Sequence, residues 1–228
     1  MAPGHSAPGA AFPLNPAAYL RSAVYAVAVD DDLVLLDVEA DAYACLPGGG
    51  LAWRGPAETP DAKALLGALV DAGLAGPVAA HSHGVCAPSR PLSRIAPPAD
   101  GSIRLLDLLR LAHAAADLLI GYRKRPLRDI LALVRRGGPA PATLQDDNEL
   151  RRLCAVFDRG VVWLPISGKC LVRSFVLLRF LQRSGLDAAW VFGVRAWPFA
   201  AHCWLQVGET ALDDWPERLA VYTPIHAA

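Results

Sequence analysis

Residues 168–185, GKCLVRSFVLLRFLQRSG, decide how the second half of the chain folds. Apolar residues recur at helical spacing after the cysteine, at Leu171, Phe175, Leu178 and Leu181. Gly185 stands where the C-terminus of a helix is expected. The pattern therefore predicts a helix that begins at Cys170. Unpaired backbone N–H groups at a helix start favour negative charge, and a thiolate is the nucleophilic form of cysteine.

Three strands, the last two joined by a tight turn, are predicted after this helix. Residues 188–194 form the first strand, and residues 202–207 alternate so that His202 and Cys203 lie on opposite faces. The turn at 208–210 leads into a further strand over 211–214, which brings Asp214 beside His202. A nucleophile, a general base and an orienting acid thus follow one another.

Each of these residues has a plainer interpretation when taken alone. A cysteine is often a small buried hydrophobe, and a histidine on a strand is more often structural than catalytic. The helix start and the order of the three residues favour catalysis by Cys170, His202 and Asp214. The sequence leaves Asp213 open as an alternative to Asp214.

The amino-terminal half carries a different pattern. Strands are predicted over 25–29, 33–38 and 43–46, and a helix over 61–74 that Gly73 stops. We expect a small winged-helix-like module of three strands plus helices over residues 18–76. The proline-rich range 77–102 is predicted to be a linker.

Residues 103–228 are expected to form the second domain. Ser102 is predicted to cap a helix that runs to about residue 121, followed by a helix between Pro126 and Gly137 and another over 148–157. Helices followed by strands are typical of an α+β fold.

Composition excludes several classes of protein. The 228 residues include 22 basic and 22 acidic side chains, so the net charge of zero argues against a nucleic-acid binder. No stretch reaches the roughly 18 apolar residues of a membrane span, and prolines interrupt the start where a secretory signal would need an apolar run. Five scattered cysteines without a C-x-x-C pair indicate a reducing cytoplasm, free thiols and no structural zinc.

No cofactor is expected. His81, His83 and Cys86 resemble a zinc cluster, but a fourth ligand is missing, so no metal is predicted. The glycines at 48–50 lack the Lys-Ser/Thr of a phosphate-binding loop, so direct ATP binding is not expected either.

The segments Gly168–Ser174, His202–Gln206 and Leu212–Asp214 together resemble the transglutaminase-like cysteine peptidases of lasso-peptide biosynthesis. The resemblance covers roughly residues 103–228 and implies a transglutaminase/papain-like protease domain with nucleophile Cys170, histidine His202 and acid Asp214. Two positions depart from the family's usual His-Ala-Trp-Val-Glu, because Cys203 replaces alanine and Gln206 replaces glutamate.

The resemblance also implies a function. Such a bacterial, cytoplasmic peptidase binds a precursor peptide, cleaves the leader from the core, and supplies the free core amine to an ATP-dependent lasso cyclase. Two alternatives remain: an acyltransferase with the same triad, and a non-catalytic leader-binding scaffold.

The amino-terminal half resembles the leader-recognition module of ribosomally made peptide pathways, similar to the small peptide-binding protein of pyrroloquinoline quinone biosynthesis. In that family the leader adds a strand to the sheet edge and packs on the last helix. The resemblance implies a leader-binding groove formed by Tyr43, Ala44, Cys45, Leu66, Leu69 and Val70. For any one of these residues, a role in the core is the simpler interpretation.

Overall fold

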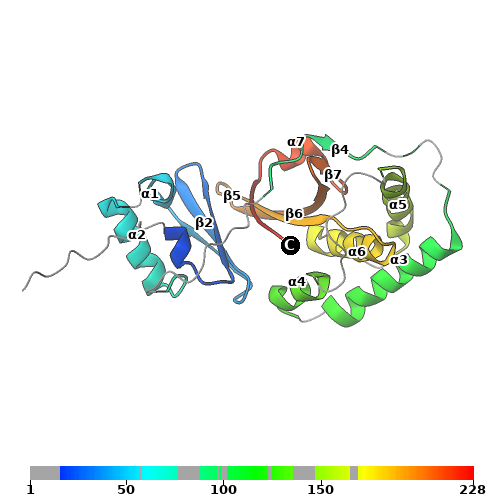
Figure 1. Ribbon diagram of the computed structural model, residues 1–228, viewed down its shortest axis with the longest axis horizontal. Helices are drawn as coiled ribbons and strands as arrows, with labels where there is room; N and C mark the ends of the chain where they lie inside the picture. Colours follow the sequence, from blue (N-terminus) through cyan, green and yellow to red (C-terminus); the bar gives the residue numbers. More distant parts are fainter. Residues whose placement is uncertain are drawn as a thin grey trace, which may run out of the picture.

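The computed structural model describes residues 16–56, 58–76, 88–96, 98, 102–122, 125–135, 147–164 and 169–228. The fold is α+β, as predicted, with one antiparallel sheet of three strands and a second sheet of five strands. Figure 1 shows the three-stranded sheet between helices α1 and α2 on one side and the second sheet on the other.

The amino-terminal sheet has the strand order β1-β2-β3. Its elements are a 3-10 helix (Pro16–Tyr19), β1 (Val24–Val29), β2 (Asp32–Asp37), β3 (Ala42–Leu46), α1 (Gly49–Arg54) and α2 (Pro60–Asp71). Helix α1 was not predicted, because its glycines look like a loop. Gly50 is required there, since a Cβ atom would lie 2.7 Å from the backbone oxygen of Asp32.

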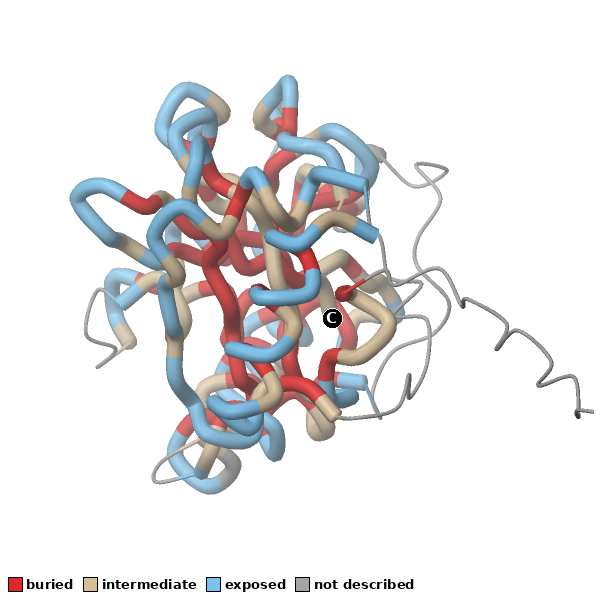
Figure 2. Tube along the Cα trace, turned by 90° about the vertical axis from the view of Figure 1, so that its left-hand side faces the viewer, coloured by how far each residue is buried: buried red, intermediate tan, exposed pale blue. Residues whose placement is uncertain are grey.

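Both faces of the central strand β2 are buried, which ties the two halves of the molecule together. Leu33 and Leu35 pack against α2, whereas Val34 and Leu36 belong to the main core of the second half. Figure 2 shows such buried segments concentrated in the interior. The amino-terminal sheet is therefore a layer of one continuous structure.

The second sheet has the order β4-β7-β6-β5-β8. Its strands are β4 (Ser93–Arg94), β5 (Ala189–Arg195), β6 (Ala200–Val207), β7 (Thr210–Ala211) and β8 (Thr223–Ala227). Helix α6 (Cys170–Arg183) packs on β6, and the short α7 (Pro216–Leu219) follows β7. Trp204 and Leu219 share a small cluster on the face opposite the main core.

Three further helices flank α6. They are α3 (Leu105–Asp117), which continues as a π-helix over Leu118–Tyr122, α4 (Leu127–Arg135) and α5 (Asp147–Gly160). The cap of α3 is Arg104, not Ser102 as predicted, because the Asp107 carboxylate accepts the Arg104 N–H at 2.9 Å. Asp107 also forms a buried ion pair with Arg152 at 2.6 Å, which joins α3 to α5.

Part of the range predicted as a linker, 77–102, is structured. Strand β4 pairs in parallel with β7. The buried Gln206 side chain donates a hydrogen bond to the Ser89 carbonyl at 3.1 Å. Gln206, which replaces the glutamate usual in the family, therefore holds the chain just before β4. The proline-rich composition concealed the strand because its partner lies far along the chain.

No helix among the described residues is long and apolar enough to cross a membrane.

Candidate active site

Cys170 is the first residue of α6, as predicted. The preceding Lys169 is extended, and its carbonyl accepts the N–H groups of Val172 and Arg173. Gly185 follows the helix with φ +84°, the left-handed conformation typical of a glycine after a helix end. The Cys170 side chain therefore sits at the positive end of a helix.

His202 and Asp214 form a short, buried pair. His202 Nε2 lies 2.6 Å from Asp214 Oδ2, and the two residues are 7% and 8% exposed. The other carboxylate oxygen of Asp214 accepts the Trp215 N–H at 2.8 Å. Because Nε2 is engaged by the carboxylate, Nδ1 is the ring nitrogen left for the hydrogen bond with Cys170.

Asp214 reaches the histidine from a bend and not from a strand, which corrects the prediction of a strand over 211–214. Strand β7 ends at Ala211, and the Asp213 carboxylate accepts the Leu205 N–H at 2.9 Å. This side-chain bond replaces the backbone ladder and directs the two aspartates differently. Asp214, and not Asp213, contacts the imidazole.

Hydrogen bonds to the Cys170 sulfur stabilise its thiolate. The contact with the Cys203 side chain, followed by that with His202, lowers the pKa of Cys170 to about 4. Burial alone would lower the pKa of His202, but its hydrogen bonds with Cys170 and Asp214 outweigh burial and raise it. At neutral pH the arrangement favours a thiolate beside an imidazolium.

Cys203 was noted in the sequence only as a departure from the family pattern. It lies on β6, is 4% exposed, and its sulfur is 3.4 Å from Ser174 Oγ. The Ser174 hydroxyl donates to the Cys170 carbonyl at 2.8 Å and accepts from Trp190 Nε1 at 2.9 Å. Ser174 therefore links the Cys203 side chain to the backbone of Cys170.

A cavity of about 200 Å³ opens onto these sulfur atoms. The carboxy-terminal half supplies Leu127, Cys170, Leu171, Phe192, Ala201, His202 and Cys203, and the amino-terminal sheet supplies Asp41 and Tyr43. The Tyr43 ring lies 5.7 Å from that of Phe199. Burial, together with the negative charges of Asp41 and Cys170, raises the pKa of Tyr43, so its hydroxyl stays protonated.

The six predicted leader-binding residues lie in three different settings. Tyr43 lines the cavity beside Cys170, whereas Ala44 and Cys45 are exposed on β3. Leu66 and Val70 are partly buried against the α2 core. Leu69 is 0% exposed, so it is a core residue and its prediction as a groove residue is wrong.

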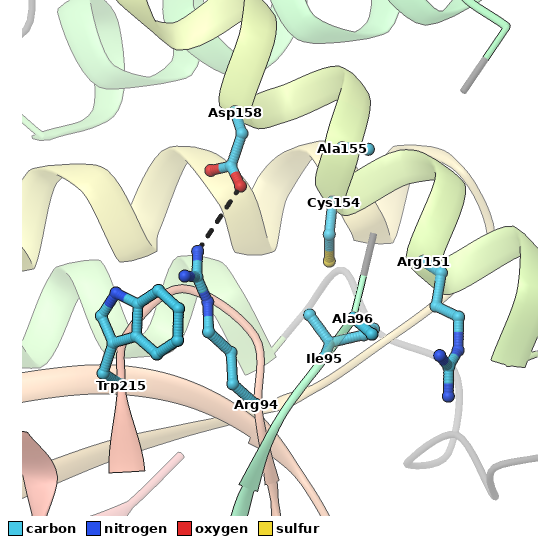
Figure 3. A pocket seen from close by; sticks show the side chains of 8 residues that line it. All are labelled: Arg94, Ile95, Ala96, Arg151, Cys154, Ala155, Asp158 and Trp215. Atoms are coloured by element: carbon cyan, nitrogen blue, oxygen red, sulfur yellow. Dashed lines mark ion pairs between the residues drawn. The ribbon is translucent and has the colours of Figure 1, made fainter. Parts of the chain in front are cut away.

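A second cavity, of about 420 Å³, is lined in part by Trp215, the residue that follows Asp214 in the chain (Figure 3). Its lining includes Arg94 and Trp215 but none of the three predicted catalytic residues. The Arg94 guanidinium stacks 4.2 Å from the centre of the Trp215 ring and pairs with Asp158 at 3.8 Å. These contacts fix the residue that follows Asp214.

No group of three or more potential metal ligands occurs within the described part of the chain. His81, His83 and Cys86 lie outside the described residues.

Comparison with known protein families gives the class of protein to which this α+β fold belongs. The model of the transglutaminase-like superfamily matches residues 112–227, about half of the chain. The chain therefore belongs to the transglutaminase-like superfamily, which confirms the predicted class.

A particular relative is more informative. The chain is 32% identical over 80 residues to the microcin J25-processing protein McjB of Escherichia coli. The aligned stretch covers 34% of this chain and 36% of that protein, so it spans about a third of the relative's length. No solved structure gives a significant match.

Proposed function

We propose that this chain is the leader peptidase of a lasso-peptide pathway, with Cys170 as nucleophile, His202 as general base and acid, and Asp214 as the residue that orients the histidine. The observation that carries the proposal is the buried His202–Asp214 pair, 2.6 Å apart, at a cavity that Cys170 and His202 both line. Membership of the superfamily and the similarity to a peptide-processing protein support it.

The reaction follows from the protonation states. The Cys170 thiolate attacks the scissile carbonyl, and His202 gives its proton to the leaving amine, which frees the core peptide. Water, deprotonated by His202, then cleaves the thioester and releases the leader with a carboxylate end. Asp214 holds the ring and stabilises its protonated form in both steps.

Two donors are available to the oxyanion. The Cys170 backbone N–H at the start of α6 is the first, as expected from the sequence. The Tyr43 hydroxyl is the second, because it lines the same cavity and stays protonated. In this proposal Tyr43 acts on the reacting carbonyl, and the amino-terminal sheet completes the active site.

The leader is proposed to bind at the outer edge of β3. Within the described residues β3 pairs only with β2, so its other edge is free to accept a peptide strand. Cys45 and Tyr43 are two residues apart, so a peptide paired along this edge advances about 7 Å from one to the other. Residues bound at Cys45 are thereby close to the cavity at Tyr43.

Leu66 and Val70 remain proposed contacts for apolar leader side chains, since both are only partly covered. The product amine is proposed to pass to a separate ATP-dependent cyclase in the cytoplasm.

The test is mass spectrometry of a precursor peptide encoded beside the gene, incubated with wild type, Cys170→Ala and Cys154→Ala. Cys154 is buried in the second cavity, so its replacement controls for the loss of a thiol. We expect wild type and Cys154→Ala to cleave at one junction, and Cys170→Ala to bind the leader without cleaving it.

An intact precursor in every mixture, despite measurable leader binding, would favour the scaffold. A product joined to an added amine, in place of a hydrolysed leader, would favour the acyltransferase.

A further inference from the structure

The active-site cavity contains two cysteines where the proposed hydrolysis uses one. Cys170 begins α6 and Cys203 lies on β6, so two elements far apart in sequence bring the two side chains to one cavity. Both residues line the same cavity, and both are held by Ser174. All four described cysteines are reduced, so the thiol pair is unbonded.

The two thiols differ in exposure and in pKa, and these two properties decide which thiol an oxidant attacks first. Cys170 is partly exposed, whereas Cys203 is buried with a pKa well above that of an ordinary thiol, first because of burial and then because of Cys170. Oxidants attack an accessible thiolate, so Cys170 reacts first. Oxidation of Cys170 removes its negative charge, which is one cause of the raised Cys203 pKa, so the neighbouring Cys203 can then act as the resolving cysteine.

We propose that Cys170 and Cys203 form a reversible disulfide when a peroxide oxidises the site, which protects the nucleophile and switches it off. The bond itself needs only the two side chains, while its consequence for peptide cleavage rests on the proposed function. Closing the bond brings the two sulfur atoms to about 2.05 Å.

The chemistry balances in two steps. The Cys170 thiolate takes one oxygen from a peroxide, and with hydrogen peroxide this gives a sulfenic acid and hydroxide. The Cys203 sulfur then displaces the sulfenic hydroxyl, which leaves as water with the Cys203 proton. The hydroxide takes up one further proton and becomes water. In total the two sulfur atoms lose two electrons, and hydrogen peroxide is reduced to two water molecules. A dithiol reductant reverses the bond by exchange.

Non-reducing peptide mapping tests the bond directly, because trypsin separates the two cysteines. Cys170 falls in peptide 170–173 and Cys203 in peptide 196–218. After treatment of the full chain with hydrogen peroxide, we expect these peptides to be linked in wild type and in Cys154→Ala. In Cys203→Ala we expect Cys170 to reach the sulfinic or sulfonic acid.

Activity provides a second readout, with each variant compared to its own untreated sample. Dithiothreitol should restore more than half of the activity of peroxide-treated wild type and less than a tenth of that of Cys203→Ala. The proposal is overturned if Cys170 is over-oxidised in wild type while Cys203 stays alkylatable, or if peroxide leaves both thiols reduced. A linked pair in a chain that cleaves no precursor would reject the peptidase and keep the disulfide.

Discussion

The two sheets of the molecule use their polar groups in opposite ways. In the five-stranded sheet, buried side chains are committed to one another: His202 with Asp214, and Gln206 with Ser89. The amino-terminal sheet instead has an exposed edge strand, β3, which within the described residues pairs only with β2. The first arrangement fixes a reactive thiolate, and the second leaves backbone groups available to a peptide.

Under the proposed function, one sheet binds the leader and the other carries the nucleophile, and the two meet at one site. Tyr43 belongs to the sheet with the free edge, yet it lines the cavity of the sheet with the thiolate. Its position depends on the packing of Val34 and Leu36 into the main core. Recognition and chemistry are therefore expected to be coupled through β2 and β3.

The largest expected effect distinguishes the two aspartates. Asp214→Asn removes the charge that stabilises the His202 imidazolium, so we expect kcat to fall about 10³-fold. Asp213→Asn keeps an acceptor for the Leu205 N–H and should change kcat less than about fivefold. Steady-state cleavage kinetics of both variants check this, and equal losses would contradict the assignment of Asp214.

Tyr43→Phe tests whether the amino-terminal sheet takes part in the chemistry. The phenyl ring retains packing on Phe199, while the oxyanion loses a donor, so we expect kcat to fall about 10- to 100-fold with leader affinity unchanged. Tyr25→Phe is the matched control, because Tyr25 is in the same sheet and contacts His226 outside the cavity. A lower leader affinity with an unchanged kcat would mean that Tyr43 binds the leader, as the sequence predicted, and does not stabilise the oxyanion.

Cys45 is a native probe of the free edge. Because its side chain is exposed on β3, bound leader should slow its alkylation by about tenfold, while a scrambled leader should not. Mass spectrometry of the Cys45 peptide measures the rate. Equal rates with and without a leader that binds would place the leader elsewhere.

The smallest expected effect concerns stability. Burial raises the pKa of Asp213 to about 7, against the hydrogen bond from Leu205 that lowers it. The native state therefore holds this proton to higher pH than the unfolded state, and the contribution of Asp213 to wild-type stability falls as pH rises from about 4 to 7. Asp213→Asn removes this dependence. The free energy of unfolding of the variant, relative to that of wild type, should therefore increase by about 1–3 kcal/mol from pH 4 to pH 8.

Urea unfolding of both proteins at the two pH values checks the difference. If the unfolding free energy of the variant relative to wild type falls with rising pH, the raised pKa of Asp213 is contradicted.

Features set by local sequence were predictable. The helix start at Cys170 and the alternation around His202 follow from short-range patterns that the structure reproduces. Two strands were not predicted. Strand β4 was missed because its partner β7 lies far along the chain. Strand β8 was missed because it contains Pro224, and proline argues against a strand except at a sheet edge. The placement of Tyr43 and the contact of Cys203 with Cys170 also arise only when the elements pack.

The most direct test of the central claim is the pH dependence of Cys170 alkylation by iodoacetamide, followed by mass spectrometry of peptide 170–173. The thiolate described here predicts a rate that rises around pH 4 and is nearly constant from pH 6 to 8. A rate that climbs steadily toward pH 8.5, as for an ordinary thiol, would contradict the Cys170–His202 pair and the peptidase built on it.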